Sequence, residues 1–192
     1  MSSTALIDWQ TSAAEALSQL EAAYRAVGGA QAGRRTNTLQ LNYAFVLLLA
    51  AHFQAYCRSL HSEATQWLVD TVDPGLGAVI AVNLTLHRQL DSRNAQPASL
   101  GADFNRLGFE FWLDVEMLDA RNRDRRGKLE RLSEWRNAIA HHDIDRRRTD
   151  LAPREVTLDA CRSWRGALNG LARSFDVVLA NRLQELTRTC PW

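Results

Sequence analysis

The spacing of apolar residues along this chain predicts helices almost throughout. The clearest pattern follows Thr157, a residue type that commonly caps helix N-termini. Apolar side chains then recur every three or four positions, at Leu158, Cys161, Trp164, Leu168, Leu171, Phe175, Val178, Leu183 and Leu186. A face about thirty residues long needs either a long partner helix or a second subunit to cover it.

Two further helices are predicted in the first half of the chain. The first has Asp8 as its N-cap and ends at the glycine pair 28–29, with apolar positions at Ala13, Leu17, Leu20, Tyr24 and Val27. The second begins at Thr36 or Asn37 and stops at the Asp-Pro-Gly sequence of residues 73–75. Its middle is apolar on nearly all sides, as expected of the central helix of a bundle.

The second half continues the helical pattern with shorter elements. Residues 76–90 form a third helical run, and the turn-rich segment 91–104 predicts a loop with a short helix near 100–107. A helix over 109–120 would bury Phe111, Trp112, Val115 and Leu118. Gly127 interrupts the pattern before the helix that contains Leu129, Leu132, Trp135 and Ile139. Because strand patterns are nearly absent, we expect one all-α domain over 1–192, an up-and-down bundle of about five or six helices.

Composition narrows the classes of function. A net charge of +1 does not indicate any particular class of binding partner. Three cysteines without a CxxC pair favour a reducing, cytoplasmic location. The longest apolar run, residues 43–51, is too short to span a bilayer, so no membrane association is expected. The histidines at 52, 61 and 87 lack the spacing of metal ligands, and no phosphate-binding glycine loop is present. We therefore predict neither a metal nor a cofactor.

Positive charge is concentrated in one segment. Residues 121–148 contain ten Lys or Arg against five acids, a local excess of +5. Such a stripe suits a phosphate backbone, and the alternative is an ordinary solvated helical face and turn. All basic residues except Lys128 are arginines, a bias typical of a GC-rich bacterial genome, so the number of arginines is not itself evidence for nucleic-acid binding.

One short motif within this segment carries candidate chemistry. Between Arg136 and His141, with Asn137 beside the arginine, six residues supply a guanidinium, a carboxamide and an imidazole. Histidine ordinarily titrates near pH ~6.5 and arginine stays charged, so these groups could cleave RNA without a metal. Residues five apart on an α-helix point about 140° apart. Arg136 and His141 would therefore converge only if the helix unwinds before His141, or if two copies meet at a symmetric interface.

The same motif has a purely structural interpretation. Arg136 could pair with Glu130 or Glu134, which lie on the same predicted helix. His141 could favourably end that helix, because a cation is stabilised at a helix C-terminus.

Residues 135–143, with the sequence WRNAIAHHD, resemble the Arg-Asn-x-x-x-His signature of HEPN domains, and in particular the RiboL-PSP-HEPN branch. Residues 42–56 look like the first core helix of that branch and 158–186 like its closing helix, so the resemblance covers about 37–186. It implies a metal-independent endoribonuclease, often a toxin with an antitoxin partner or an antiviral defence effector. It also implies a homodimer whose two motifs meet at the two-fold axis.

The resemblance, with general acid–base chemistry, assigns a role to each residue of the motif. His141 would accept the proton of the ribose 2′-OH or protonate the leaving 5′-oxygen, and Arg136 would hold the scissile phosphate of the RNA. Asn137 would orient the imidazole or a phosphate oxygen. The products would be a 2′,3′-cyclic phosphate and a 5′-OH. Weaker candidates for substrate binding are Arg131, His142 and Arg146.

Two other functions stay open. The chain could be a catalytically inactive HEPN bundle that binds RNA or regulates a protein partner, and Gln54 favours this because related sequences often have an acid at that position. The chain could also be the helical half of a nucleotidyl-transfer pair, although no residue argues specifically for it.

Overall fold

The computed structural model describes residues 1–27, 35–144, 150–151, 153 and 155–192. Of the described residues, 81% are helical, and none of them lies in a strand. The elements are α1 (Thr4–Asp8), a π-helical turn η1 (Trp9–Ala13), α2 (Ala14–Val27), α3 (Arg35–Asp70), α4 (Pro74–Thr85), α5 (Gln89–Ser92), α6 (Pro97–Phe104), a 3₁₀ turn η2 (Asn105–Leu107), α7 (Phe111–Leu118), α8 (Asn122–Ala140) and α10 (Leu158–Thr187). The predicted all-α bundle is confirmed, with somewhat more helical segments than the five or six expected.

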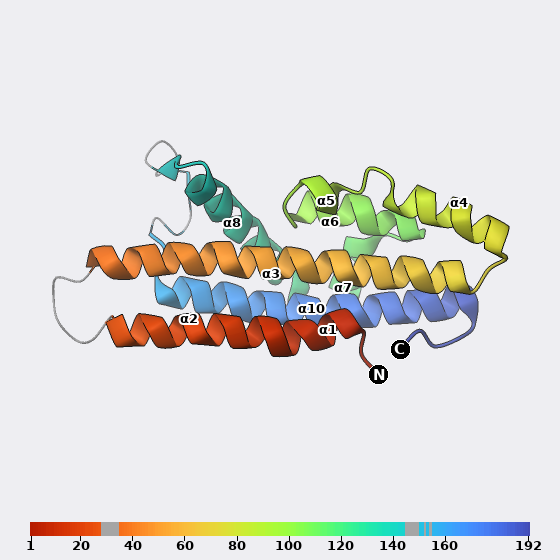
Figure 1. The fold of residues 1–192 in the computed structure, drawn as a ribbon, viewed down its shortest axis with the longest axis horizontal. Coiled ribbons are helices and arrows are strands. Elements are labelled where there is room, and N and C mark those ends of the chain that lie inside the picture. Colours follow the sequence, from red (N-terminus) through yellow and green to blue (C-terminus); the bar gives the residue numbers. More distant parts are fainter. Residues whose placement is uncertain (28–34, 145–149, 152, 154) are drawn as a thin grey trace.

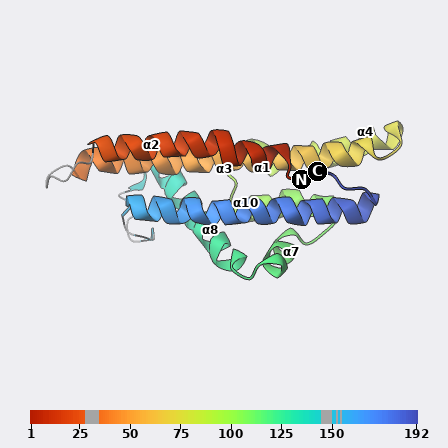
Figure 2. The ribbon, with the colours of Figure 1, turned by 90° about the horizontal axis from the view of Figure 1, so that it is seen from below.

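The two longest helices, α3 and α10, form the body of the molecule. They run side by side, with α1, η1 and α2 lined up along them, while α8 crosses the pair at an angle (Figures 1 and 2). The shorter helices α4 to α6 lie along the other side of α3 (Figure 1). The long apolar face of α10 is therefore covered by a partner helix of matching length within the same chain.

An aromatic cluster holds α6, α7 and α10 together. Phe111 stacks on Phe104 with ring centroids 4.5 Å apart, and its edge meets Phe175 at 4.7 Å. All three side chains are fully buried. Burying rings of this size contributes several kcal/mol in total, and it fixes the start of the segment that leads into α8.

The first helix begins earlier than predicted. Its N-cap is Ser3, whose side chain accepts a hydrogen bond from the backbone N–H of Leu6, so the assignment of Asp8 as the cap is wrong. Ser3 is itself held by the buried carboxylate of Asp176 on α10. Glu63 on α3 accepts the next two backbone N–H groups. The helix start is therefore fixed by carboxylates from distant parts of the chain.

Of three other predicted helix boundaries, one is confirmed, one is wrong and one is displaced by a single residue. Thr157 caps α10 as predicted, its hydroxyl accepting from the backbone N–H of Ala160. Gly127 does not interrupt α8, which is continuous through it; the break lies before α8, at residues 119–121. The second helix begins at Arg35, just before the predicted Thr36. The glycine pair predicted to end the first helix lies outside the described residues.

Leu118, which was expected to be buried, and Leu186, from the apolar face of α10, are exposed. Leu118 is 44% exposed and Leu186 is 50% exposed. Both lie at helix ends, where the neighbouring helices no longer cover the apolar stripe. Across the part of the chain that the structure describes, no helix combines the length and apolarity that crossing a membrane requires.

Candidate functional site

The motif lies at the C-terminal end of α8. This helix is anchored by buried Leu129, Leu132 and Trp135, and it ends at Ala140, so His141 is its C-cap with φ −98° and ψ 5°. The backbone N–H of His141 still donates to the carbonyl of Asn137 at 3.0 Å. The helix therefore stops immediately before the histidine.

The turn after His141 closes the helix in a specific way. His142 has a φ of 53°, in the left-handed region. Its N–H donates to the carbonyl of Ile139 at 3.2 Å, and the N–H of Asp143 donates to that of Ala138 at 2.9 Å. This pair of bonds is the Schellman motif, in which the left-handed position is usually glycine. His142 thus has a backbone role that sequence reasoning did not foresee.

Within one copy of the chain, His141 has no described side-chain contact with the other two motif residues. Arg136 and Asn137 are partly buried, whereas His141 is exposed beyond the end of the helix. Within the described residues, no side-chain hydrogen bond connects His141 to Arg136 or Asn137. This agrees with the divergence of about 140° expected for residues five positions apart.

Arg136 does not form the salt bridges that the structural interpretation predicts. Glu134 pairs instead with Arg131, at 2.9 Å. No carboxylate in the described ranges, Glu130 included, lies within ion-pair distance of Arg136. Within the described residues, its guanidinium donates a hydrogen bond from Nη1 to the Oδ1 of Asn137, at 3.3 Å. The guanidinium is therefore partly buried without a described counter-ion.

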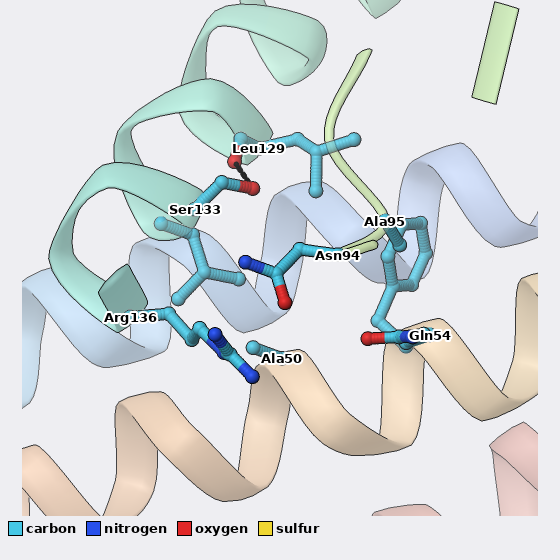
Figure 3. A pocket seen from close by; sticks show the side chains of 9 residues that line it. Ala50, Gln54, Asn94, Ala95, Leu129, Ser133 and Arg136 are labelled. Atoms are coloured by element: carbon cyan, nitrogen blue, oxygen red, sulfur yellow. Dashed lines mark hydrogen bonds between the residues drawn. The ribbon is translucent and has the colours of Figure 1, made fainter. Parts of the chain in front are cut away.

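Arg136 lines a cavity between α8, α3 and the segment that joins α5 to α6. Gln54 from α3, Asn94 from the joining segment and Arg136 all border it (Figure 3). The remaining lining residues are Ala50, Phe53, Ala95, Leu129, Leu132 and Ser133. The cavity volume is about 10 Å³, close to the smallest space that holds one water molecule. The interior of this cavity is therefore too small for a phosphate group.

Asn137 is fixed by two donors. Its Oδ1 accepts from Arg136 Nη1 and from Asn94 Nδ2, the latter at 2.5 Å. Because a guanidinium can only donate, the atom facing Arg136 must be the amide oxygen, so Asn94 must present its NH₂ group to the same oxygen. Asn137 can therefore act on a ligand only as a donor, through its own NH₂ group.

The side-chain amide of Gln54 has a structural role. Its Nε2 donates to the carbonyl of Leu90 at 3.1 Å and to that of Arg93 at 2.9 Å. A carboxylate at this position could not donate to either carbonyl. The amide therefore ties α3 to the segment that presents Asn94. Sequence reasoning missed Asn94, because it lies 43 positions from Asn137 and belongs to no motif.

Most of the basic stripe is neutralised. Of the seven basic residues described within 121–148, six pair with acids: Arg121 and Arg125 with Asp119, Arg123 and Arg126 with Glu116, Lys128 with Asp124, and Arg131 with Glu134. Glu116 and Asp119 precede the stripe in sequence, which is why counting charges within it overstated the excess. Arg136 is the exception among these seven. Arg146, the remaining substrate-binding candidate, lies outside the described residues.

Comparisons with protein-family models, curated proteins and solved structures found no match to this chain. Among the residues that the structure describes, no group of three or more His, Cys, Asp or Glu side chains could hold a metal ion.

Proposed function

We propose that this chain is a metal-independent endoribonuclease of the HEPN type, with Arg136, Asn137 and His141 as its reacting groups. The observation that carries the proposal is the state of Arg136, a partly buried guanidinium with no carboxylate partner in the described residues, beside an amide that can only donate. Both groups suit the negatively charged oxygens of a phosphate. The other basic side chains described in α8 form ion pairs with acids, whereas Arg136 is available to bind a ligand.

The chemistry follows from the groups present. The ribose 2′-oxygen attacks the phosphorus and the bond to the 5′-oxygen breaks, leaving a 2′,3′-cyclic phosphate and a 5′-OH. One His141 accepts the proton of the 2′-OH, and a second His141 donates a proton to the 5′-oxygen. Arg136 and the NH₂ group of Asn137 bind the phosphate oxygens as charge develops on them.

A second copy of the chain is part of this proposal. Within the described residues of one copy, no hydrogen bond joins His141 to Arg136, and helical positions five apart diverge by about 140°, so two motifs are expected to share one nucleotide. An isologous dimer about a two-fold axis through this region would supply both motifs to one cleft. The exposed position of His141 leaves it available for such an interface.

The decisive assay is cleavage of end-labelled RNA in EDTA by the wild type, Arg136→Ala and His141→Ala. We expect cleavage by the wild type and at least a hundredfold loss in both variants, because each removes a group that acts in the transition state. The matched controls are Arg123→Ala, an exposed arginine of the same helix, and His87→Ala, an exposed histidine far from the motif. Cleavage that survives both motif substitutions would contradict the proposal.

Sedimentation or light-scattering mass measurement tests the dimer in the same preparations. A mass of twice the chain's 21.6 kDa at concentrations that support cleavage is expected. A fully active monomer would contradict the shared site.

One observation favours a non-catalytic alternative, in which the bundle binds RNA or a regulatory partner without cleaving it. The side-chain amide of Gln54 is engaged with two backbone carbonyls, so this position offers no acid to polarise a histidine. RNA binding that Arg136→Ala abolishes, without cleavage by the wild type, would select this alternative. The toxin or defence role, the antitoxin partner and the cytoplasmic location stay predictions.

A further inference from the structure

The segment between α5 and α6 is held more firmly than its position between two short helices would suggest. Asp103, which is 1% exposed, accepts the backbone N–H groups of Gln89 and Leu90 at 2.8 and 2.7 Å. Gln54 of α3 donates to the carbonyl groups of Leu90 and Arg93. The residue that follows, Asn94, is thereby fixed in place.

Asn94 is also the link between this segment and α8. Its NH₂ group donates to Asn137 Oδ1, the same atom that accepts from Arg136. No other hydrogen bond described for the Arg136 guanidinium restrains it. Among the described hydrogen bonds, the guanidinium is thus linked to Asn94 through the one oxygen that both groups donate to.

We propose that Asn94 is a positioning residue for Arg136: it fixes Asn137 Oδ1, and through that oxygen it aims the guanidinium at the bound phosphate. Gln54 supports Asn94 by fixing the segment that carries it. This inference rests on the proposed nuclease function for its kinetic consequences. Its geometric consequence, an ordered Arg136 side chain, does not depend on that function.

Two substitutions separate positioning from simple packing. Asn94→Ala removes the donor, and Asn94→Asp keeps the shape of the side chain but replaces the donor with a carboxylate. If Asn94 only fills space, the near-isosteric Asp is the milder change. If it positions Arg136, Asp is the worse change, because a carboxylate beside Arg136 would pair with the guanidinium that should bind phosphate.

The kinetic test measures cleavage of RNA by these variants. We expect Asn94→Ala to lower kcat about tenfold to a hundredfold, as misplaced reacting groups do, with KM changed less than threefold. Asn94→Asp should lose more activity than Asn94→Ala. The matched control is Asn83→Ala, since the Asn83 amide bonds within α4 to the carbonyl of Val79. Unchanged kcat in both Asn94 variants would overturn the proposal.

A spectroscopic test is independent of catalysis. In ¹H–¹⁵N spectra, the Nε–H signal of Arg136, assigned by its loss in Arg136→Lys, should shift and broaden in Asn94→Ala but not in Asn83→Ala. Should the wild type cleave no RNA, the proposed function fails while this signal still tests the positioning. An Arg136 signal that is identical in the wild type and Asn94→Ala overturns the positioning role whatever the activity.

Discussion

The side-chain amide of Gln54 lies 2.9 Å from the backbone carbonyl of Arg93, although the two residues are 39 positions apart. The same amide nitrogen also donates to the carbonyl of Leu90. One carboxamide on the central helix thus satisfies two backbone groups of the segment that leads to Asn94. An amide suits this position for a physical reason, since a carboxylate could not donate to either carbonyl.

Replacing Gln54 with Glu should destabilise the protein. The substitution removes a donor to two carbonyls and places a charge beside them, which costs about 1–3 kcal/mol of unfolding free energy. Urea denaturation monitored by circular dichroism measures the change. Gln184→Glu, on the exposed face of α10, is the control and should change stability by less than about 0.5 kcal/mol. Equal stability of the two variants would show that the Gln54 bonds contribute nothing.

Replacing His142 with Gly should stabilise the protein. His142 occupies a left-handed backbone conformation at the end of α8, which costs a non-glycine residue about 1–2 kcal/mol. Glycine relieves this strain but loses more backbone entropy on folding, so a net gain of about 0.5–1 kcal/mol is expected. Thermal or urea unfolding measures it. His141→Gly, at an ordinary φ of −98°, should be destabilising instead, and a loss of stability in His142→Gly would refute the strain.

The buried imidazole of His61 should make stability depend on pH. Its Nδ1 faces Arg88, which can only donate, so Nδ1 is the unprotonated nitrogen and Nε2–H donates to the carbonyl of Asp103. Burial, together with the nearby Arg88 guanidinium, lowers the pKa of His61 to about 4. Folding therefore favours the neutral imidazole.

The sign of this effect follows from proton linkage. Between about pH 6.5 and pH 4 the unfolded chain binds a proton at His61 that the folded protein does not, so the unfolding free energy falls as the pH falls. The total contribution is roughly 3 kcal/mol. Denaturation at pH 7, 5.5 and 4.5 should show a shallower decline in His61→Gln than in the wild type. An equal decline in the two proteins would rule His61 out as the cause.

The three thiols should differ sharply in reactivity. Cys57 and Cys161 are fully buried, and burial raises the pKa of Cys161 to about 12 and that of Cys57 well above its usual value. Cys190 is exposed. Because the thiolate is the reactive form, an aromatic disulfide reagent should label one thiol in the native protein and three in urea. Fast labelling that persists in Cys190→Ser would contradict the burial of the other two.

The local sequence pattern was enough to predict which segments are helical, but not where several of the helices begin or break. The threonine cap of α10 is a signal within a few residues and was confirmed. The start of the first helix was misplaced, because the groups that stabilise it, Glu63 and Asp176, are distant in sequence. Gly127 was expected to break α8, but a glycine costs a helix only about 1 kcal/mol, and the packing of that helix outweighs it.

The candidate site, too, could be predicted only in part. Arg136, Asn137 and His141 were recognisable because they stand within six residues. The electrostatic state of Arg136 was not predictable, since Glu134 could have paired with either it or Arg131. Likewise, the acids that neutralise much of the stripe, Glu116 and Asp119, lie outside it.

Periodicity and residue type at short range were enough to predict that the chain is helical, most of the apolar faces that its helices bury, and the six residues that carry candidate chemistry. Which polar groups meet depends instead on how the helices pack. The tertiary structure gave Gln54 two carbonyls to hold, brought Asn94 to Asn137, and left Arg136 without a described carboxylate partner. The reason is that hydrogen bonds and ion pairs act over a few ångströms, so a partner dozens of residues away becomes known only once the chain has folded.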